Sequence, residues 1–195
     1  SKQAVFSLGN KKVNLLDTPG HVDFSAEMER TLQVLDYAVL VISGADGVQG
    51  HTETLWKLLK LYDIPTFIFI NKMDQQGTDK AALLSELKER LDEGCIAFDR
   101  EESTETLEEL AMTDEKVLDY FMEHESIRKE DICRLIKERR VFPCYFGSAL
   151  KLEGVQELLC GFERYMEPYT GTEEFGAKVF KISRDDKGER LTFLK

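Results

Sequence analysis

Three short apolar runs, each followed by a polar or glycine-containing loop and then by leucines at helical spacing, constrain the fold of this chain most strongly. The runs cover residues 38–42, 66–70 and 141–146. Continuous apolar runs of this length are typical of strands buried on both faces, and alternation of such strands with helices is typical of a parallel sheet. The sequence therefore predicts an α/β fold with a mostly parallel sheet and helices on both of its faces.

The loop after the run at 66–70 carries an amide, an ammonium and a carboxylate at Asn71, Lys72 and Asp74, with Met73 between them. A carboxylate at Asp74 accepts two hydrogen bonds from N1–H and the exocyclic amine of guanine, whereas adenine presents no such pair of donors. Asn71 would face N7 of the base, and the aliphatic stem of Lys72 would lie across it. This pattern predicts a guanine site, and the alternative is an ordinary polar loop.

An upstream loop follows another strand-like segment. It consists of Asp17, Thr18, Pro19, Gly20 and His21. Asp17 at a strand end would hold a water on Mg²⁺, because this ion keeps most of its waters and takes few protein oxygens. The backbone N–H of Gly20 would approach a terminal phosphate closely, and His21 stands where an attacking water has to be oriented. The alternative is a Pro-Gly turn with an exposed histidine.

The third loop follows the run at 141–146 and contains Ser148, Ala149 and Leu150. Small residues at this point would let backbone N–H groups reach O6 of guanine. All three loops come at the carboxyl ends of predicted parallel strands, which is the edge where open α/β sheets bind ligands. We therefore expect the three loops to converge on one nucleotide.

These three loops resemble, in order and spacing, the third, fourth and fifth nucleotide loops of translational GTPases. The stretches 21–24, 46–49 and 71–77 are similar to elongation factor G and, more closely, to the tetracycline-resistance ribosomal protection proteins. The segment 176–182 resembles the first strand of the barrel that follows the G domain in that family. The resemblance implies a P-loop-NTPase-like G domain that binds GTP or GDP with Mg²⁺ and hydrolyses GTP, with His21 as the catalytic residue.

The resemblance also implies a cytoplasmic protein whose partners are guanine nucleotide and the ribosome, through RNA and ribosomal proteins, with no membrane or DNA partner. Three alternatives remain open at this point. They are elongation factor G itself, a nucleotide-binding or ribosome-interaction module without turnover, and a P-loop kinase or other ATP-handling enzyme, against which Asp74 argues.

Two features of the family do not occur among the 195 residues. They are the phosphate loop Gly-x-x-x-x-Gly-Lys-Ser/Thr and the switch threonine. The chain opens on the strand that follows the first switch in the family, so it resembles a fragment of a longer protein. Without the lysine and backbone amides of that loop, the β- and γ-phosphates lose most of their electrostatic partners. We expect this chain to bind GTP weakly or not at all and not to hydrolyse it.

The expected domain order is a G domain over residues 1–168 that is truncated at its N-terminus, followed over 169–195 by a linker and the start of a β-barrel. A helical insert is expected at about 99–140, with stripes at Val117, Leu118, Phe121 and Met122 and at Ile132, Leu135 and Ile136. The two strands expected within 175–195 would be edges of an unfinished barrel, which should fray, pack on the G domain or pair with another chain.

Composition sets further limits. No apolar run reaches membrane length, and 42% hydrophobic residues suffice for one sizeable core.

The four cysteines, Cys95, Cys133, Cys144 and Cys160, lack C-x-x-C spacing and are expected to be buried free thiols. Much of the net charge of -11 comes from acids in the insert, Asp114 among them. These acids predict a solvated helical face or, alternatively, a docking surface for a basic ribosomal protein.

Overall fold

The structure is a computed structural model that describes residues 2–18, 26–98, 103–168, 176–184 and 186–195. The chain forms two compact units. One unit consists of Ser1–Asp36 together with Pro168–Lys195, and the other is Tyr37–Glu167. The domain boundary expected near residue 168 stays a prediction.

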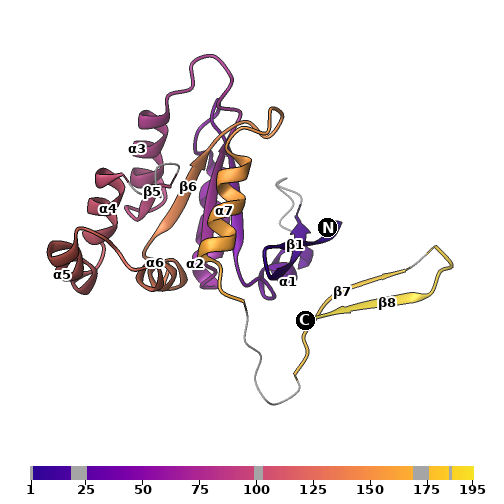
Figure 1. Cartoon of the computed structure of the whole chain (residues 1–195). Helices are drawn as coiled ribbons and strands as arrows, with labels where there is room; N and C mark the ends of the chain where they lie inside the picture. The colour runs from indigo at the N-terminus through magenta and orange to yellow at the C-terminus, as the bar shows by residue number, and fades with distance from the viewer. Residues whose placement is uncertain (1, 19–25, 99–102, 169–175, 185) are drawn as a thin grey trace. The chain divides into compact units, whose positions relative to one another are not determined.

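A four-stranded parallel sheet forms the centre of the larger unit (Figure 1). Its strand order is β3 (Ala38–Ser43), β4 (Thr66–Asn71), β6 (Phe142–Phe146) and β5 (Cys95–Ala97). The three predicted apolar runs form β3, β4 and β6, which confirms the α/β fold with a parallel sheet. Strand β5 was not predicted, because three residues are too few for a recognisable apolar run.

Helices cover both faces of this sheet, as the sequence predicts. Phe67 of β4 packs edge-on against Phe162 with 5.1 Å between ring centroids, whereas Phe142 of β6 packs against Trp56 at 4.6 Å. The strand register places Phe67 and Phe142 on opposite faces of the sheet, because side chains alternate along a strand. The helices that supply Phe162 and Trp56 therefore lie on opposite faces. Trp56 belongs to α2 (Gly50–Leu61), which joins β3 to β4, and Phe162 belongs to α7 (Val155–Tyr165), which follows β6. Helix α3 (Lys80–Arg90) joins β4 to β5.

The expected helical insert is present as three short helices, α4 (Thr104–Ala111), α5 (Glu115–His124) and α6 (Lys129–Lys137). The Thr106 hydroxyl of α4 donates to the Ala97 carbonyl, which attaches the insert to the edge strand β5.

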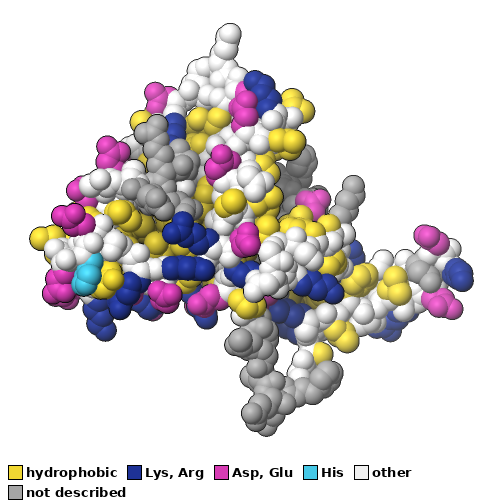
Figure 2. All heavy atoms as spheres, in the orientation of Figure 1, with side chains coloured by type: hydrophobic (Ala, Val, Ile, Leu, Met, Phe, Trp, Pro, Cys, Tyr) yellow, Lys and Arg dark blue, Asp and Glu magenta, His cyan; other side chains and the backbone are white. Residues whose placement is uncertain are grey.

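Burial of the two predicted stripes differs. Both segments form helices as predicted. Ile132, Leu135 and Ile136 are buried, but on α5 only Val117 is fully buried, while Leu118 and Met122 remain 38% and 74% exposed. Only one face of α5 is therefore covered. Figure 2 shows acidic and hydrophobic side chains sharing the surface of the insert.

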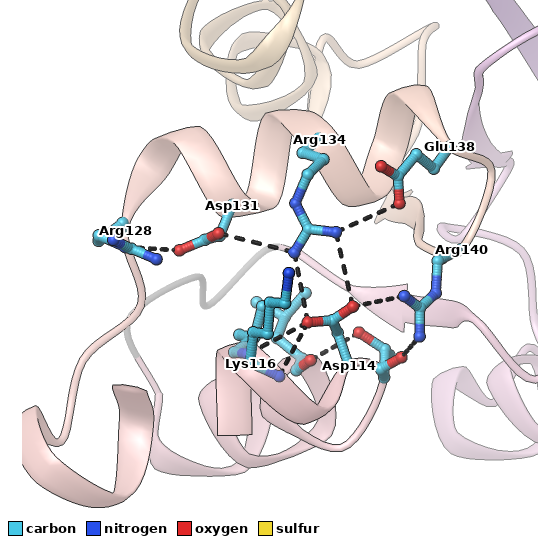
Figure 3. A network of polar contacts seen from close by, with 10 residues as sticks. Asp114, Lys116, Arg128, Asp131, Arg134, Glu138 and Arg140 are labelled. Carbon is cyan, nitrogen blue, oxygen red and sulfur yellow. Dashed lines mark hydrogen bonds and ion pairs between the residues drawn. The ribbon is translucent and has the colours of Figure 1, made fainter. Parts of the chain in front are cut away.

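Asp114 ties the insert together instead of lying on a solvated acidic face. Its carboxylate accepts from the amides of Lys116 and Val117 at the start of α5 and pairs with Arg134 of α6 and with Arg140 (Figure 3). Burial raises the pKa of Asp114, but the hydrogen bonds from Arg134, Val117 and Arg140 outweigh it and hold the pKa below its ordinary value. The network thus joins the start of α5 to α6 and to the approach to β6.

The smaller unit contains two antiparallel hairpins and one helix among its described residues. Strands β1 (Lys2–Leu8) and β2 (Lys11–Asp17) pair through a turn at residues 9–10. Helix α1 (Ala26–Leu32) follows the residues 19–25, which lie outside the described ranges. Strands β7 (Val179–Arg184) and β8 (Arg190–Leu194) form the second hairpin.

The second hairpin packs on the described part of its own unit. Phe180 of β7 is buried, and the Lys195 ammonium lies 2.8 Å from the Val34 carbonyl oxygen and 2.5 Å from an Asp36 carboxylate oxygen. These contacts attach the end of the chain to the segment that follows α1.

Three of the four cysteines, Cys95, Cys133 and Cys144, are buried free thiols as predicted. Cys160 is exposed, so that prediction is wrong. The reason is the orientation of helix α7. Its buried face carries Leu158 and Phe162, and Cys160 lies on the opposite, exposed face. Within the described ranges, no helix has the length and apolar character needed to cross a membrane.

Candidate functional site

Two of the three predicted loops meet at the carboxyl ends of β4 and β6, because these strands are neighbours in the parallel sheet. The Gly147 amide donates to the Ile70 carbonyl at 2.9 Å, and the Met73 amide donates to the Gly147 carbonyl at 3.0 Å. The loop that begins at Asn71 is therefore joined to the loop that contains Ser148 through backbone hydrogen bonds.

Asn71 braces these two loops with its side-chain oxygen. Its Oδ1 accepts from the Lys72 amide at 2.8 Å and from the Ala149 amide at 2.9 Å. Lys72 has a φ of 63°, a left-handed conformation that is unusual for a residue with a Cβ. The Asn71 oxygen points into the loops and helps to hold that conformation. The expected contact of its amide nitrogen with guanine N7 stays a prediction.

Asp74 carries the carboxylate at this loop junction. A hydrogen bond from the Ser148 side chain lowers the pKa of Asp74 below its ordinary value, against a smaller opposing effect of burial. Lys151 lowers it further, with its ammonium 3.4 Å from Oδ2 of Asp74. The Asp74 side chain remains 20% exposed, and Ser148 is buried. The site therefore presents an ionised carboxylate that is anchored from the protein side and reachable from solvent.

Lys151 was missed in the sequence. It stands directly after the predicted site residues, but its pairing with Asp74 depends on how the loop folds back. That geometry brings together side chains that are far apart in the chain, and no local pattern encodes it.

Close packing of two glycines gives the Ser148 loop its shape. The Ser148 and Glu153 backbones exchange hydrogen bonds of 3.0 and 3.1 Å, which closes the loop between them. A Cβ at Gly147 would overlap the Glu153 carbonyl oxygen, and Gly154 has a φ of 73°. The closed loop leaves Leu150 92% exposed.

The loop after β3 is held next to the same strand end. The Gly44 amide donates to the Asn71 carbonyl at 2.7 Å, and the Val48 amide donates to Glu86 at 3.1 Å. Arg90 of α3 pairs with Glu86 at 2.9 Å and also donates to the Val48 carbonyl. Charged side chains of α3 thus support the stretch 46–49. The sequence of α3 by itself did not indicate this role.

Of the remaining predicted residues, Asp17 and Thr18 lie in the smaller unit. Asp17 is exposed at the end of β2, and Thr18 follows it half-buried. Pro19, Gly20 and His21 lie outside the described residues. Among the residues that the structure describes, no group of three or more His, Cys, Asp or Glu side chains gathers for a metal ion. A Mg²⁺ ion held through the water of one carboxylate and through phosphate oxygens does not need such a group.

A parallel sheet with paired loops at its carboxyl edge and an anchored carboxylate agrees with the comparison against known families. The model of the elongation factor Tu GTP binding domain matches residues 1–168. The chain belongs to this family. The resemblance of the three loops to those of translational GTPases is thereby confirmed at the level of the family.

Among its relatives, the oxytetracycline resistance protein of Streptomyces rimosus is 33% identical over 222 residues, which cover 100% of this chain and 34% of the relative. The tetracycline resistance protein TetW of Butyrivibrio fibrisolvens is 35% identical over 201 residues, covering 94% of this chain and 32% of the relative. The chain thus spans about a third of the length of the curated relatives it matches.

A solved structure supports the fold. The crystal structure of ttk003000868 from Thermus thermophilus superimposes with a TM-score of 0.83 at 23% identity, over 99% of this chain and 36% of that one. This likeness shows that the arrangement of strands and helices found here is the one adopted by that protein.

Proposed function

We propose that this chain is the guanine-nucleotide-binding part of a ribosome-associated translational GTPase of the tetracycline-resistance ribosomal protection type. The observation that carries the proposal is the ionised, Ser148-anchored carboxylate of Asp74 at the junction of two loops in a GTP-binding domain. The resistance proteins among its relatives support the choice of type, and elongation factor G is the alternative within the same family.

In this proposal the base is read by the described loops. Asp74 accepts from N1–H and the exocyclic amine of guanine, which gives a bidentate, charge-assisted contact. The loop 148–150 offers a backbone amide to O6, and the aliphatic stem of Lys72 together with Leu150 lies against the base. Asn71 and Met73 keep these groups in place through the backbone and side-chain bonds that join the loops.

The phosphate end is assigned to the loop after β2. Gly20 offers a backbone amide to the terminal phosphate, Thr18 and Pro19 shape the turn, and His21 orients the water that attacks the γ-phosphorus. Orientation needs only an imidazole that donates and accepts hydrogen bonds. The exposed carboxylate of Asp17 fits an ion bound through water. Mg²⁺ supplies neutralisation of the phosphate charge when it is bound.

These 195 residues contain no Gly-x-x-x-x-Gly-Lys-Ser/Thr segment, which favours weak nucleotide binding and no hydrolysis by this chain alone. The lack of this segment also leaves the alternative of a nucleotide-binding module without turnover open. Calorimetry of the chain with GTP tests the expected weak binding, and micromolar affinity would contradict it.

Sequencing of the gene upstream of the first codon tests the alternative of a binding module without turnover. A phosphate loop encoded there would support turnover instead.

Titration of the full-length protein with GTP and ATP, followed by ribosome-stimulated phosphate release, tests the function itself. We expect binding and release with GTP only. Equal affinity for ATP would contradict the assignment of Asp74. Growth of cells that carry the complete gene in the presence of tetracycline then separates a protection protein, which sustains growth, from a translocation factor, which does not.

A further inference from the structure

The carboxylate proposed to read guanine already has a partner on its solvent side. The Lys151 ammonium lies 3.4 Å from Oδ2 of Asp74, and the Lys151 side chain is 53% exposed. Ser148, the other side-chain partner of Asp74, is buried. The serine therefore holds the carboxylate from within the protein, whereas the lysine meets it from the side on which a ligand would arrive.

A guanine base and this lysine compete for the same atoms. A bidentate contact with N1–H and the exocyclic amine uses both oxygens of Asp74, in the plane of the carboxylate. A carboxylate has about four lone-pair sites. The Ser148 hydrogen bond occupies one of them from the protein interior, so it is compatible with a bound base. The Lys151 ammonium meets Oδ2 on the exposed side of the carboxylate, where the base has to lie, so the competition is for space and for Oδ2 together.

The lysine is free to leave while the rest of the site stays in place. The Ala149 amide is bonded to Asn71, and the Ser148 and Glu153 backbones are bonded to each other, so the loop on which Lys151 stands is closed. The lysine side chain is flexible and half exposed. Displacement of its ammonium therefore needs a change of rotamer and no change of the loop.

We infer that Lys151 sets the affinity of the base site, because its ammonium pairs with Asp74 and guanine has to displace it. This inference rests on the proposed function of Asp74. Exposed ion pairs are worth little, so removal of the lysine should strengthen guanine binding about two- to fivefold. If Lys151 instead assisted guanine binding, removal of the lysine would weaken that binding.

Guanosine is the suitable probe, because it lacks phosphates and so reports on the base site alone. Its binding to the chain is followed by NMR, through amide shifts of residues 71–74 and 148–151. We expect Lys151→Met to bind guanosine about two- to fivefold more tightly than the native chain. Added salt should tighten guanosine binding to the native chain, because it screens the ion pair, and should leave the variant unchanged.

Lys137→Met is the matched control. Lys137 is likewise an exposed lysine, 65% exposed, and pairs with Glu167 at 3.3 Å in the same unit but on α6. Its removal should change neither guanosine affinity nor the salt dependence.

Two results would overturn different statements. Unchanged or weaker guanosine binding by Lys151→Met, with binding by the native chain intact, would overturn the inference and leave the proposed function standing. Absence of guanosine-dependent shifts in both chains, or equal shifts with adenosine, would overturn the assignment of the base site itself.

Discussion

The two groups of residues proposed to bind nucleotide, one in each unit, have different structural support. The loops at the base end follow β4 and β6, the central strands of the parallel sheet, and in β4 every residue from Thr66 to Ile70 is buried. The Asp17 loop follows β2, one strand of a two-stranded hairpin whose described side chains are all half-buried or exposed. The base end therefore has a packed core directly beneath it, and the phosphate-side strand does not.

The difference teaches that the residues proposed to recognise the base all belong to the larger unit. The Asn71 side chain accepts from the Ala149 amide, and the Gly147 backbone bonds to Ile70 and Met73. Base selectivity and phosphate chemistry should then respond to different substitutions, with the largest effect at the phosphate end and the smallest in the helical insert.

The largest effect is expected from His21→Ala in the full-length protein. Loss of a group that orients the attacking water should slow ribosome-stimulated GTP hydrolysis about 100- to 10,000-fold. GTP affinity should stay nearly the same, because His21 is not assigned a contact with the ground-state nucleotide. Single-turnover phosphate release and equilibrium binding check the two parts. Unchanged turnover would remove His21 from the mechanism.

Among the residues proposed to bind the base, Asp74→Asn should shift the base preference from guanine toward xanthine. The new amide presents a donor where guanine needs an acceptor, and a loss of about 10- to 100-fold in guanosine affinity is expected. Competition between guanosine and xanthosine measures the exchange. Asp119→Asn, an exposed acid on α5, is the control and should leave the preference unchanged. A guanine preference that survives in Asp74→Asn would count against the site.

Packing beneath the base end is tested by Gly147→Ala. The added methyl group would overlap the Glu153 carbonyl oxygen, so the closed loop has to open or shift. Overpacking of this kind costs about 1–3 kcal/mol. Urea unfolding should show this loss, and guanosine binding should fall with it. Gly50→Ala is the matched control, because a Cβ there meets no atom within 4 Å, and it should leave stability unchanged or slightly raised. Equal stability of the two variants would contradict the predicted overlap.

The smallest effect is expected from Asp114→Ala in the helical insert. Loss of the carboxylate that caps α5 should lower the free energy of unfolding by about 1 kcal/mol. Because the pKa of Asp114 is lowered in the folded chain, its contribution is present above the ordinary carboxyl pKa and is lost as pH falls through the folded value. The stability difference between native chain and variant should therefore shrink in acid, as urea unfolding between about pH 3 and 7 would show. Guanosine binding should not change, and a coupled loss would show that the base end is less independent than inferred.

Sequence patterns were sufficient for the features that depend on neighbours along the chain. Strands β3, β4 and β6 were predictable because a continuous apolar run has few alternatives to burial in a parallel sheet. The order of the loops at their ends identified the base-end residues, and the structure brings Asn71, Asp74, Ser148 and Ala149 together. The family match supports the same interpretation.

Other features were decided only by tertiary structure, since they depend on groups far apart in the chain. The pairing of Lys151 with Asp74, the contacts of Asp114 with Arg134 and Arg140, and the exposure of Cys160 each depend on which segment lies opposite. Hydrophobic periodicity determines that an element forms and which of its faces is apolar. Whether that face is covered, and which charge meets which, is determined by the packing of elements against one another, because burial and ion pairing are properties of distance in space.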